Sequence, residues 1–189
     1  TVYERSDRFG GLLMYGIPNM KLDKEVVQRR IDLMEKLGIN FVANTEVGRD
    51  ITADELLKEY DRVVLATGAS VPRDLDVPGR HLTGIRFAVD FLTETTKNVL
   101  ASDNKKLGPT LEGKHVLVIG GGDTGNDCIG TAVRLGAASV KQLEITPEPP
   151  EKRLPTNPWP QYPMIKRVGY GQEEANFVQD TELTTYATS

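Results

Sequence analysis

The chain has 189 residues, enough for one large domain or two small ones, and its 39% hydrophobic and 26% charged residues are typical of a soluble globular protein. A net charge of −4 with dispersed basic residues argues against a nucleic-acid surface, and no apolar run approaches the ~18 to 20 residues of a transmembrane helix. The single cysteine, Cys128, excludes an internal disulfide and a metal or iron–sulfur site of several thiolates, so we expect no metal site.

The chain begins in an apolar, strand-like run at Thr1 without an initiating methionine, so we expect it to be a piece of a longer protein. The given sequence shows no signal-peptide pattern, and we expect a cytoplasmic location, with an organelle as the alternative if a targeting segment lies outside this sequence. Glu4 follows the first run. A carboxylate at the end of a strand can accept two hydrogen bonds from an adenosine ribose, but taken alone Glu4 is better explained as a surface acid.

The first half of the chain alternates helix-like and strand-like patterns. Four elements are expected there: a helix over 23–37 that ends at Gly38, a strand over 39–47, a helix over 52–60 and a buried strand over 63–69. The first helix has an apolar stripe that indicates a core face, made of Val26, Val27, Ile31, Met34 and Leu37. The second begins at a capping box, Thr52 and Glu55. The small residues that end the last strand let a ligand approach the backbone, although a plain tight turn explains them equally well.

Connecting segments lead to the second half. Prolines and glycines make 71–84 a connector, and the pattern over 86–100 predicts a helix. The polar stretch 101–113, with Lys105 and Lys106, is expected to be a loop or hinge.

A glycine-rich turn dominates the second half. The apolar run 116–119 leads directly into Gly120, Gly122 and Gly125, and a helix-like run and a strand-like run follow. This order is the context that the G-x-G-x-x-G dinucleotide fingerprint requires: the glycines permit a tight turn, close approach of a pyrophosphate, and close packing of helix on strand. We therefore predict a parallel βαβ unit over 111–145 that binds a nucleotide, rather than an ordinary glycine-rich turn. Cys128 lies on its helix and is interpreted as a small core residue.

Seven of the eleven prolines lie between Pro147 and Pro163. Asn157–Pro160 cannot form a regular helix or a central strand, which leaves an ordered wrap or a flexible linker. The aromatic side chains of Trp159 and Tyr162 favour an ordered wrap that they anchor. The polar end, 173–189, is expected to be weakly helical or frayed.

Several motifs then point to one family. They are Glu4-Arg5, Phe9 to Lys21, Ala66 to Ala69, Pro72 to Leu75, Val118 to Cys128, Leu143 to Ile145 with Pro147, Pro149 and Pro150, and Asn157 to Gln161. Together they resemble the part of glutamate synthase that takes up electrons, especially in the NADH-dependent type. The last motif is the most specific, and the resemblance covers essentially the whole chain.

The resemblance implies an α/β fold of Rossmann-like parallel sheets, with two dinucleotide-binding domains arranged as in glutathione reductase and truncated at both ends. It implies a partial FAD-binding domain over 1–80, a connecting helix and hinge over 81–110, and an NAD(P)-binding domain over 111–189 with a proline-rich segment over 146–163. The implied cofactors are FAD and NADH, with NADPH as the alternative. Iron–sulfur clusters and FMN would belong to other parts of the parent protein. The implied partner is the large glutamate synthase domain or subunit, with neither a nucleic acid nor a membrane.

The resemblance also implies roles for individual residues. On the FAD side they are Glu4 for the ribose and Gly10, Gly11, Leu12, Gly16, Ile17, Pro18, Ala66, Thr67 and Gly68 along the cofactor. On the nicotinamide side they are Gly120, Gly121, Gly122, Asp123, Thr124 and Gly125 for the pyrophosphate. Glu144 lies 19 residues after Gly125, close to the ~20 at which an acid meets the adenosine ribose, and therefore predicts a preference for NADH. A solvated acid at a strand end is the alternative for Glu144.

The implied activity is oxidation of NADH and reduction of FAD, which feeds the synthesis of glutamate from 2-oxoglutarate and glutamine. The cofactors carry this chemistry, so no catalytic side chain is assigned, and His81 and His115 receive no chemical role. Two alternatives stay open. One is a related FAD and NAD(P)H reductase module that serves another acceptor, and the other is a nucleotide-binding fragment without activity.

Overall fold

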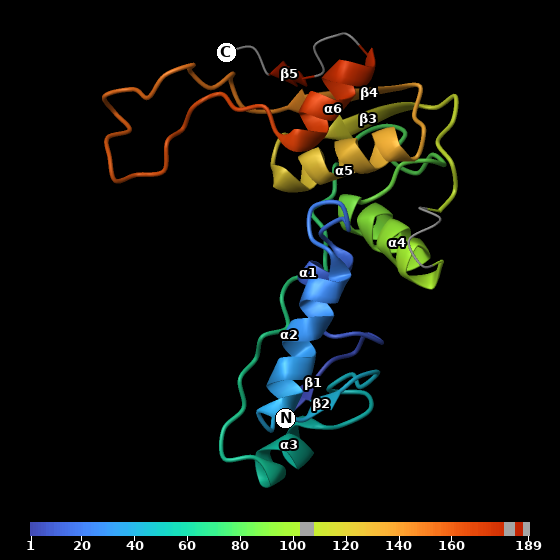
Figure 1. The fold of residues 1–189 in the computed structure, drawn as a ribbon, viewed down its shortest axis with the longest axis vertical. Coiled ribbons are helices and arrows are strands. Elements are labelled where there is room, and N and C mark those ends of the chain that lie inside the picture. Colours follow the sequence, from blue (N-terminus) through green and yellow to red (C-terminus); the bar gives the residue numbers. More distant parts are fainter. Residues whose placement is uncertain (103–107, 180–183, 187–189) are drawn as a thin grey trace. The chain divides into compact units, whose positions relative to one another are not determined.

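The computed structural model describes residues 1–102, 108–179 and 184–186 (Figure 1). The chain divides into two units, Thr1–Phe87 and Ala88–Ser189, and each contains its own parallel sheet. The assignment of FAD to the first part and of NAD(P)H to the second stays a prediction. Of the loop or hinge expected over 101–113, residues 103–107 with Lys105 and Lys106 lie outside the described residues, and residues 108–113 carry no helix or strand.

The first unit contains a short sheet and several helices. Its elements are β1 (Val2–Tyr3), α1 (Leu12–Tyr15), α2 (Lys24–Lys36), β2 (Phe41–Val42) and α3 (Ala53–Glu59). The two strands are parallel, with Val2 opposite Phe41 and Tyr3 opposite Val42. A parallel pair needs a crossover connection, and α1 and α2 lie on that connection.

The predicted helix starts in this unit are confirmed. The carboxylate of Asp23 accepts a hydrogen bond from the Glu25 N–H at 3.0 Å, at the start of α2. At the start of α3, the Thr52 hydroxyl accepts from the Glu55 N–H at 3.2 Å, and the Glu55 carboxylate accepts from the Thr52 N–H at 2.8 Å. Both caps satisfy N–H groups that the first helical turn leaves without a partner.

The apolar stripe of α2 is buried only in part. Val27 and Ile31 are buried, whereas Val26 and Leu37 are exposed. Within its unit, α2 packs against the four-residue helix α1, which covers a narrow face. The expectation of a full core face was therefore wrong at the first and last positions of the stripe.

Two strands expected in the first unit are shorter or absent. The strand expected over 39–47 is reduced to β2, and Asn44 beyond it has a left-handed φ of 53°, which breaks an extended strand. The buried strand expected over 63–69 was wrong, because no strand is assigned there and its residues are exposed. A strand needs a neighbour to pair its backbone and cover its side chains, and the sheet of β1 and β2 does not extend to this run.

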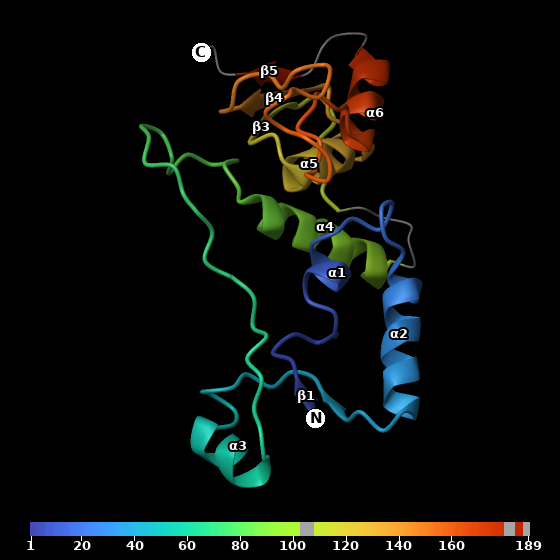
Figure 2. The same cartoon turned by 90° about the vertical axis from the view of Figure 1, so that its left-hand side faces the viewer.

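The second unit is built on a parallel sheet in the strand order β3-β4-β5 (Figure 2). Its elements are α4 (Ala88–Ala101), β3 (His115–Ile119), α5 (Asp123–Arg134), β4 (Ser139–Glu144), α6 (Tyr170–Gln179) and β5 (Thr184–Tyr186). The pairing of β3 with β4 runs from His115 opposite Ser139 to Ile119 opposite Leu143. The predicted βαβ unit over 111–145 is confirmed, and so is the helix expected over 86–100. The end over 173–189 was expected to be weakly helical or frayed: the helical alternative is confirmed up to Gln179 in α6, and neither alternative holds for Thr184–Tyr186, which form the strand β5.

The core of the second unit forms around α5. This helix contacts α4, α6, β3 and β4, so several of its faces are covered. Ile129, Ala132, Val140 and Ala175 form the central cluster, and each is almost fully buried. Cys128 is buried as well, which confirms its interpretation as a core residue.

The proline-rich segment after β4 has no helix or strand, but polar contacts hold it. Asn157 is buried, and its side chain donates to Gln161 Oε1 at 3.0 Å and accepts from the Met164 N–H at 2.9 Å. Trp159 and Tyr162 are exposed, so the predicted aromatic anchors were wrong. The buried side-chain amide of Asn157 anchors the segment instead. It forms hydrogen bonds with the backbone carbonyl of Tyr162 and the backbone N–H of Met164, which no helix or strand pairs here.

Candidate dinucleotide-binding site

The glycine-rich turn connects β3 to α5 in the second unit. Gly120 follows the last residue of β3 with a φ of 115°, a left-handed conformation that favours glycine. Gly122 is the N-cap of α5, and no side chain caps this helix. The N–H groups of the first turn therefore face the approach to the turn without a side-chain acceptor, and the helix dipole adds partial positive charge there. This arrangement attracts a phosphate.

Gly122 leaves room for a ligand. Its φ is −76°, so the backbone itself does not require glycine, and a Cβ atom added at this position meets no other atom within 4 Å. The open space in front of Gly122 fits the role of the second fingerprint glycine, where the backbone must approach a pyrophosphate closely.

Gly125 allows α5 to pack tightly on the turn. A Cβ atom added there would overlap the carbonyl oxygen of Gly120 and lie 3.0 Å from Nε2 of Gln142. This is the close packing that the third fingerprint glycine provides. Asp123 and Thr124 lie exposed in the first turn of α5, where the acid interacts favourably with the helix dipole.

Glu144 ends β4 beside the turn. Its Oε1 accepts a hydrogen bond from the Thr146 N–H at 2.9 Å, and its Oε2 lies against Gly121, where any Cβ atom would overlap it. The hydrogen bond from the Thr146 N–H is the main reason why the pKa of Glu144 lies below its usual range. The carboxylate is therefore charged at neutral pH. Gly120–Gly125 and Glu144 thus meet at the carboxyl ends of β3 and β4. Their role in binding a dinucleotide stays a prediction.

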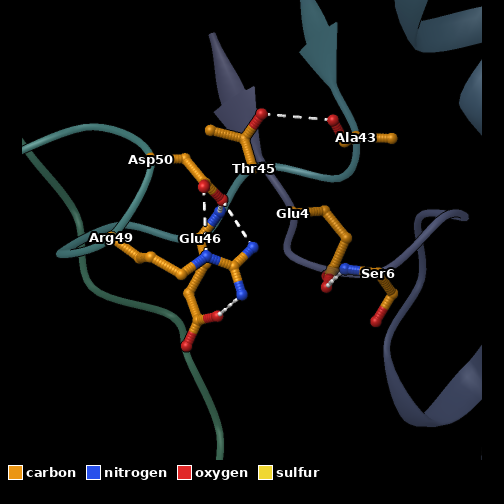
Figure 3. Close-up of polar contacts among 7 residues, drawn as sticks. All are labelled: Glu4, Ser6, Ala43, Thr45, Glu46, Arg49 and Asp50. Atoms are coloured by element: carbon orange, nitrogen blue, oxygen red, sulfur yellow. Dashed lines mark hydrogen bonds and ion pairs between the residues drawn. The ribbon is translucent and has the colours of Figure 1, made fainter.

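On the FAD side, Glu4 directly follows β1. Its Oε1 accepts a hydrogen bond from the Ser6 N–H at 2.9 Å (Figure 3). Figure 3 also shows Arg49 paired with Glu46 and Asp50, a surface cluster that water screens and that defines no ligand site. The geometry leaves both explanations of Glu4 open, the ribose acceptor and the surface acid.

Lys24 organises the loop between α1 and α2, and sequence reasoning missed it. Its Nζ is buried and donates to the carbonyl oxygens of Leu13 at 3.0 Å and Ile17 at 2.6 Å. These bonds compensate the burial of its charge and fix Gly16–Pro18, the loop predicted near the flavin. The sequence contained a clue, because Lys24 lies on the same helical face as Val27 and Ile31.

The remaining residues predicted on the FAD side are not brought together. Gly10 and Gly11 have φ angles of 113° and 51° and lead into α1 at the exposed Leu12. Ala66–Gly68 lie in the exposed run without a strand, outside the sheet of β1 and β2. The structure therefore brings the residues predicted on the nicotinamide side together and does not do so for those on the FAD side.

Neither histidine belongs to the glycine turn: His81 lies in the first unit and His115 begins β3. His81 is exposed, and Nδ1 of His115 lies 2.7 Å from the Ser139 hydroxyl, a contact between neighbouring strands. Among the described residues, no cluster of His, Cys, Asp or Glu is arranged to hold a metal ion. None of the helices in the described ranges has the length and apolar character needed to cross a membrane.

The second unit has a parallel sheet with a glycine-rich turn and an acid at the carboxyl ends of its strands. This arrangement defines a dinucleotide-binding protein of the Rossmann type. The chain belongs to the pyridine nucleotide-disulphide oxidoreductase family, whose sequence pattern matches residues 51–156. This match confirms the predicted fold class and the predicted class of protein, an oxidoreductase.

Relatives extend the match over most of the chain. It is 58% identical over 174 residues to "Glutamate synthase [NADH]" of Saccharomyces cerevisiae, which covers 92% of this chain and 8% of that protein. It is 52% identical over 176 residues to "Glutamate synthase [NADPH] small chain" of Bacillus subtilis, with 93% and 36% covered. The resemblance to glutamate synthase is confirmed, and the chain spans well under half the length of these relatives.

A solved structure shares the fold. The structure of Mycobacterium tuberculosis FprA in complex with NADPH matches with a TM-score of 0.57 and 23% identity, over 80% of this chain and 36% of that one. At this identity the likeness supports the fold and nothing finer.

Proposed function

We propose that this chain is the electron-input part of a glutamate synthase, which oxidises NADH, reduces FAD and works with a large synthase domain or subunit. The names of the relatives support the parent enzyme, and their greater length supports the larger partner. The observation that carries the proposal is the charged carboxylate of Glu144, fixed beside Gly121 at the turn. Iron–sulfur clusters and FMN belong, in this proposal, to other parts of the parent protein.

In the proposed complex, the pyrophosphate lies against the N–H groups at the start of α5, over the open space at Gly122. Glu144 accepts hydrogen bonds from both adenosine ribose hydroxyls, and its charge repels the 2′-phosphate of NADPH, so NADH is preferred. The bound cofactors supply the hydride chemistry. The residues of this chain bind and orient them and exclude water, and Glu4 with the loop that Lys24 fixes would hold FAD.

Flavin absorbance tests the proposal on the full-length protein. We expect a yellow protein that absorbs near ~450 nm and loses this absorbance when NADH is added without oxygen. A colourless protein that binds NADH would instead be a nucleotide-binding module without activity. Bleaching by NADH without formation of glutamate would favour a reductase that serves another acceptor.

The Gly122→Val variant tests the glycine turn itself. Its side chain enters open space, so the fold tolerates it, but it occupies the volume that the pyrophosphate needs. We expect the Kd for NADH, measured by calorimetry, to rise by at least about tenfold while the melting temperature stays within a few degrees. Ala138→Val, an exposed change before β4, is the matched control. Unchanged affinity in Gly122→Val would contradict the assignment of the turn.

A further inference from the structure

A chain of side-chain amides links α6 to the glycine turn. Gln142, on β4, is fully buried, and its Nε2 donates to the carbonyl oxygen of Gly120 at 2.8 Å. Its Oε1 accepts from Nε2 of Gln172 at 2.7 Å. Oε1 of Gln172 in turn accepts from the Gly169 N–H at 2.7 Å. We refer to these contacts between Gly120, Gln142, Gln172 and Gly169 as the amide relay.

A second contact fixes the same end of α6. Oδ1 of Asn126, in the first turns of α5, accepts from the N–H groups of Gly171 at 3.0 Å and Gln172 at 3.1 Å. Gly171 permits this approach, because a Cβ atom there would overlap the Asn126 carbonyl oxygen. The start of α6 is therefore bound to α5 and, through the relay, to β4 and the turn, although it lies about fifty residues further along the chain.

The relay acts on a peptide plane that glycines leave flexible. Gly120 is followed by Gly121 and Gly122, and glycine has the widest conformational freedom of any residue. In a trans peptide the C=O and the following N–H point in opposite directions. Holding the Gly120 carbonyl inward on Gln142 therefore turns the Gly121 N–H outward. The Gly121 N–H is also one of the groups that stabilise the charged form of Glu144, so the same peptide plane influences both halves of the site.

We propose that Gln142 and Gln172 are positioning residues of the dinucleotide site, which hold the Gly120–Gly121 peptide so that α6 sets the affinity for the pyrophosphate. This inference rests on the proposed function, because it requires the turn to bind a dinucleotide. A turn that is already ordered loses less conformational entropy when the ligand binds, and the relay provides that order. Neither glutamine touches the ligand in this arrangement.

The test uses the full-length protein with Gln142→Met and Gln172→Met, which keep the side-chain length and remove the amides. Lys141→Met and Glu173→Gln are the controls, because they are exposed neighbours on the same strand and helix. NADH and ADP-ribose, which share the pyrophosphate, are titrated by calorimetry, and NADH-dependent flavin reduction is measured at saturation. We expect the Kd for both ligands to rise by about tenfold in each variant, with the saturated rate and the controls unchanged.

The double variant distinguishes a relay from two separate packing effects. If both glutamines act through one peptide plane, the double variant loses no more affinity than either single variant, and additive losses would overturn the proposal. Gln172 is only half-buried, so its replacement is better tolerated. If Gln142→Met does not fold, the affinity of Gln172→Met alone tests the proposal. Wild-type protein that binds neither ligand would refute the proposed function. Wild-type binding with unchanged affinity in the variants would refute the amide relay alone.

Discussion

Among single residues, Glu144 has the largest expected effect on cofactor choice. Relatives named for NADH and relatives named for NADPH both match this chain at more than 50% identity, so their names do not decide between the cofactors. We predict NADH, because the acid at the end of β4 is charged and borders the turn. The next positions, Ile145 to Pro147, offer no cation for a 2′-phosphate.

Glu144→Ala tests this preference in the full-length enzyme. In the proposed complex, this change would remove two hydrogen bonds to the ribose and the repulsion of a 2′-phosphate. We expect the NADH/NADPH ratio of kcat/KM to narrow by about tenfold, equivalent to roughly 1.4 kcal/mol. Glu112→Ala is the control, since this exposed acid precedes the amino end of β3, at the opposite end of the strand from the turn. A wild-type preference for NADPH, or an unchanged ratio in the variant, would exclude this role of Glu144.

Cys128 gives a second prediction for a single residue. Burial, and to a smaller extent the charge of Asp127, raises the pKa of its thiol from 9.0 to about 12. The neutral thiol is favoured in the folded protein, so at pH 8 the reactive thiolate falls by roughly a thousandfold, and stability declines as the pH rises above the unfolded pKa of ~9. A thiol reagent should therefore react slowly with native protein and quickly in denaturant. Rapid reaction in the native state would contradict the core position, and no other cysteine in the chain interferes.

The site residues that the sequence predicted are those with local patterns. The glycines follow a fixed spacing, and Glu144 follows from its distance to them along the chain. Gln142, Gln172 and Lys24 were missed because their hydrogen bonds join partners far away in sequence or backbone carbonyls. Their clue was weaker: a polar residue at a position where the alternation of a strand or the stripe of a helix calls for an apolar one.

At the level of elements, the contact of α5 with α6 predicts that a Gly→Ala change in a helix will lower the stability of the protein instead of raising it. Gly→Ala inside a helix ordinarily stabilises by up to about 1 kcal/mol. At Gly171 the added methyl would overlap the Asn126 carbonyl oxygen and lie 2.8 Å from the Gly130 nitrogen. Overpacking of this kind costs about 1–3 kcal/mol, so we expect Gly171→Ala to lower the free energy of unfolding in urea. Glu173→Ala, exposed on the same turn, is the control, and a stabilised Gly171→Ala would contradict the close packing.

Elements with strong local patterns were predicted correctly, and elements that depend on distant neighbours were not. The βαβ unit over 111–145 has its strand, turn and helix signals in one continuous stretch, so its pattern was sufficient. The run over 63–69 has the composition of a strand, but strand formation also requires a pairing partner, which composition does not supply. In the proline-rich segment the exclusion of regular structure was correct. The anchoring by Asn157 instead of aromatic rings depends on contacts that no periodic pattern encodes.

For the whole chain, the exposed apolar run in the first unit has the largest expected consequence. Val64, Leu65 and Val71 are 85%, 81% and 88% exposed. The run that contains them has the residue composition of a strand, but its backbone is not assigned to a strand and pairs with neither β1 nor β2. Exposed apolar surface and unpaired strand-like backbone both favour association between chains. We therefore expect the 189-residue chain, produced by itself, to associate as its concentration rises.

Light scattering across a concentration series tests this association. Val64→Lys with Leu65→Lys should reduce it, because two large apolar side chains become charged. Ala69→Lys with Ser70→Lys is the matched control, since both pairs change the net charge from −4 to −2 (two added positive charges) but the control removes no large apolar surface. A net charge closer to zero by itself promotes association, so a decrease confined to the first pair isolates the apolar contribution. Equal behaviour of the two variants, or a monomeric parent chain at every concentration, would show that the run over 63–69 does not drive association.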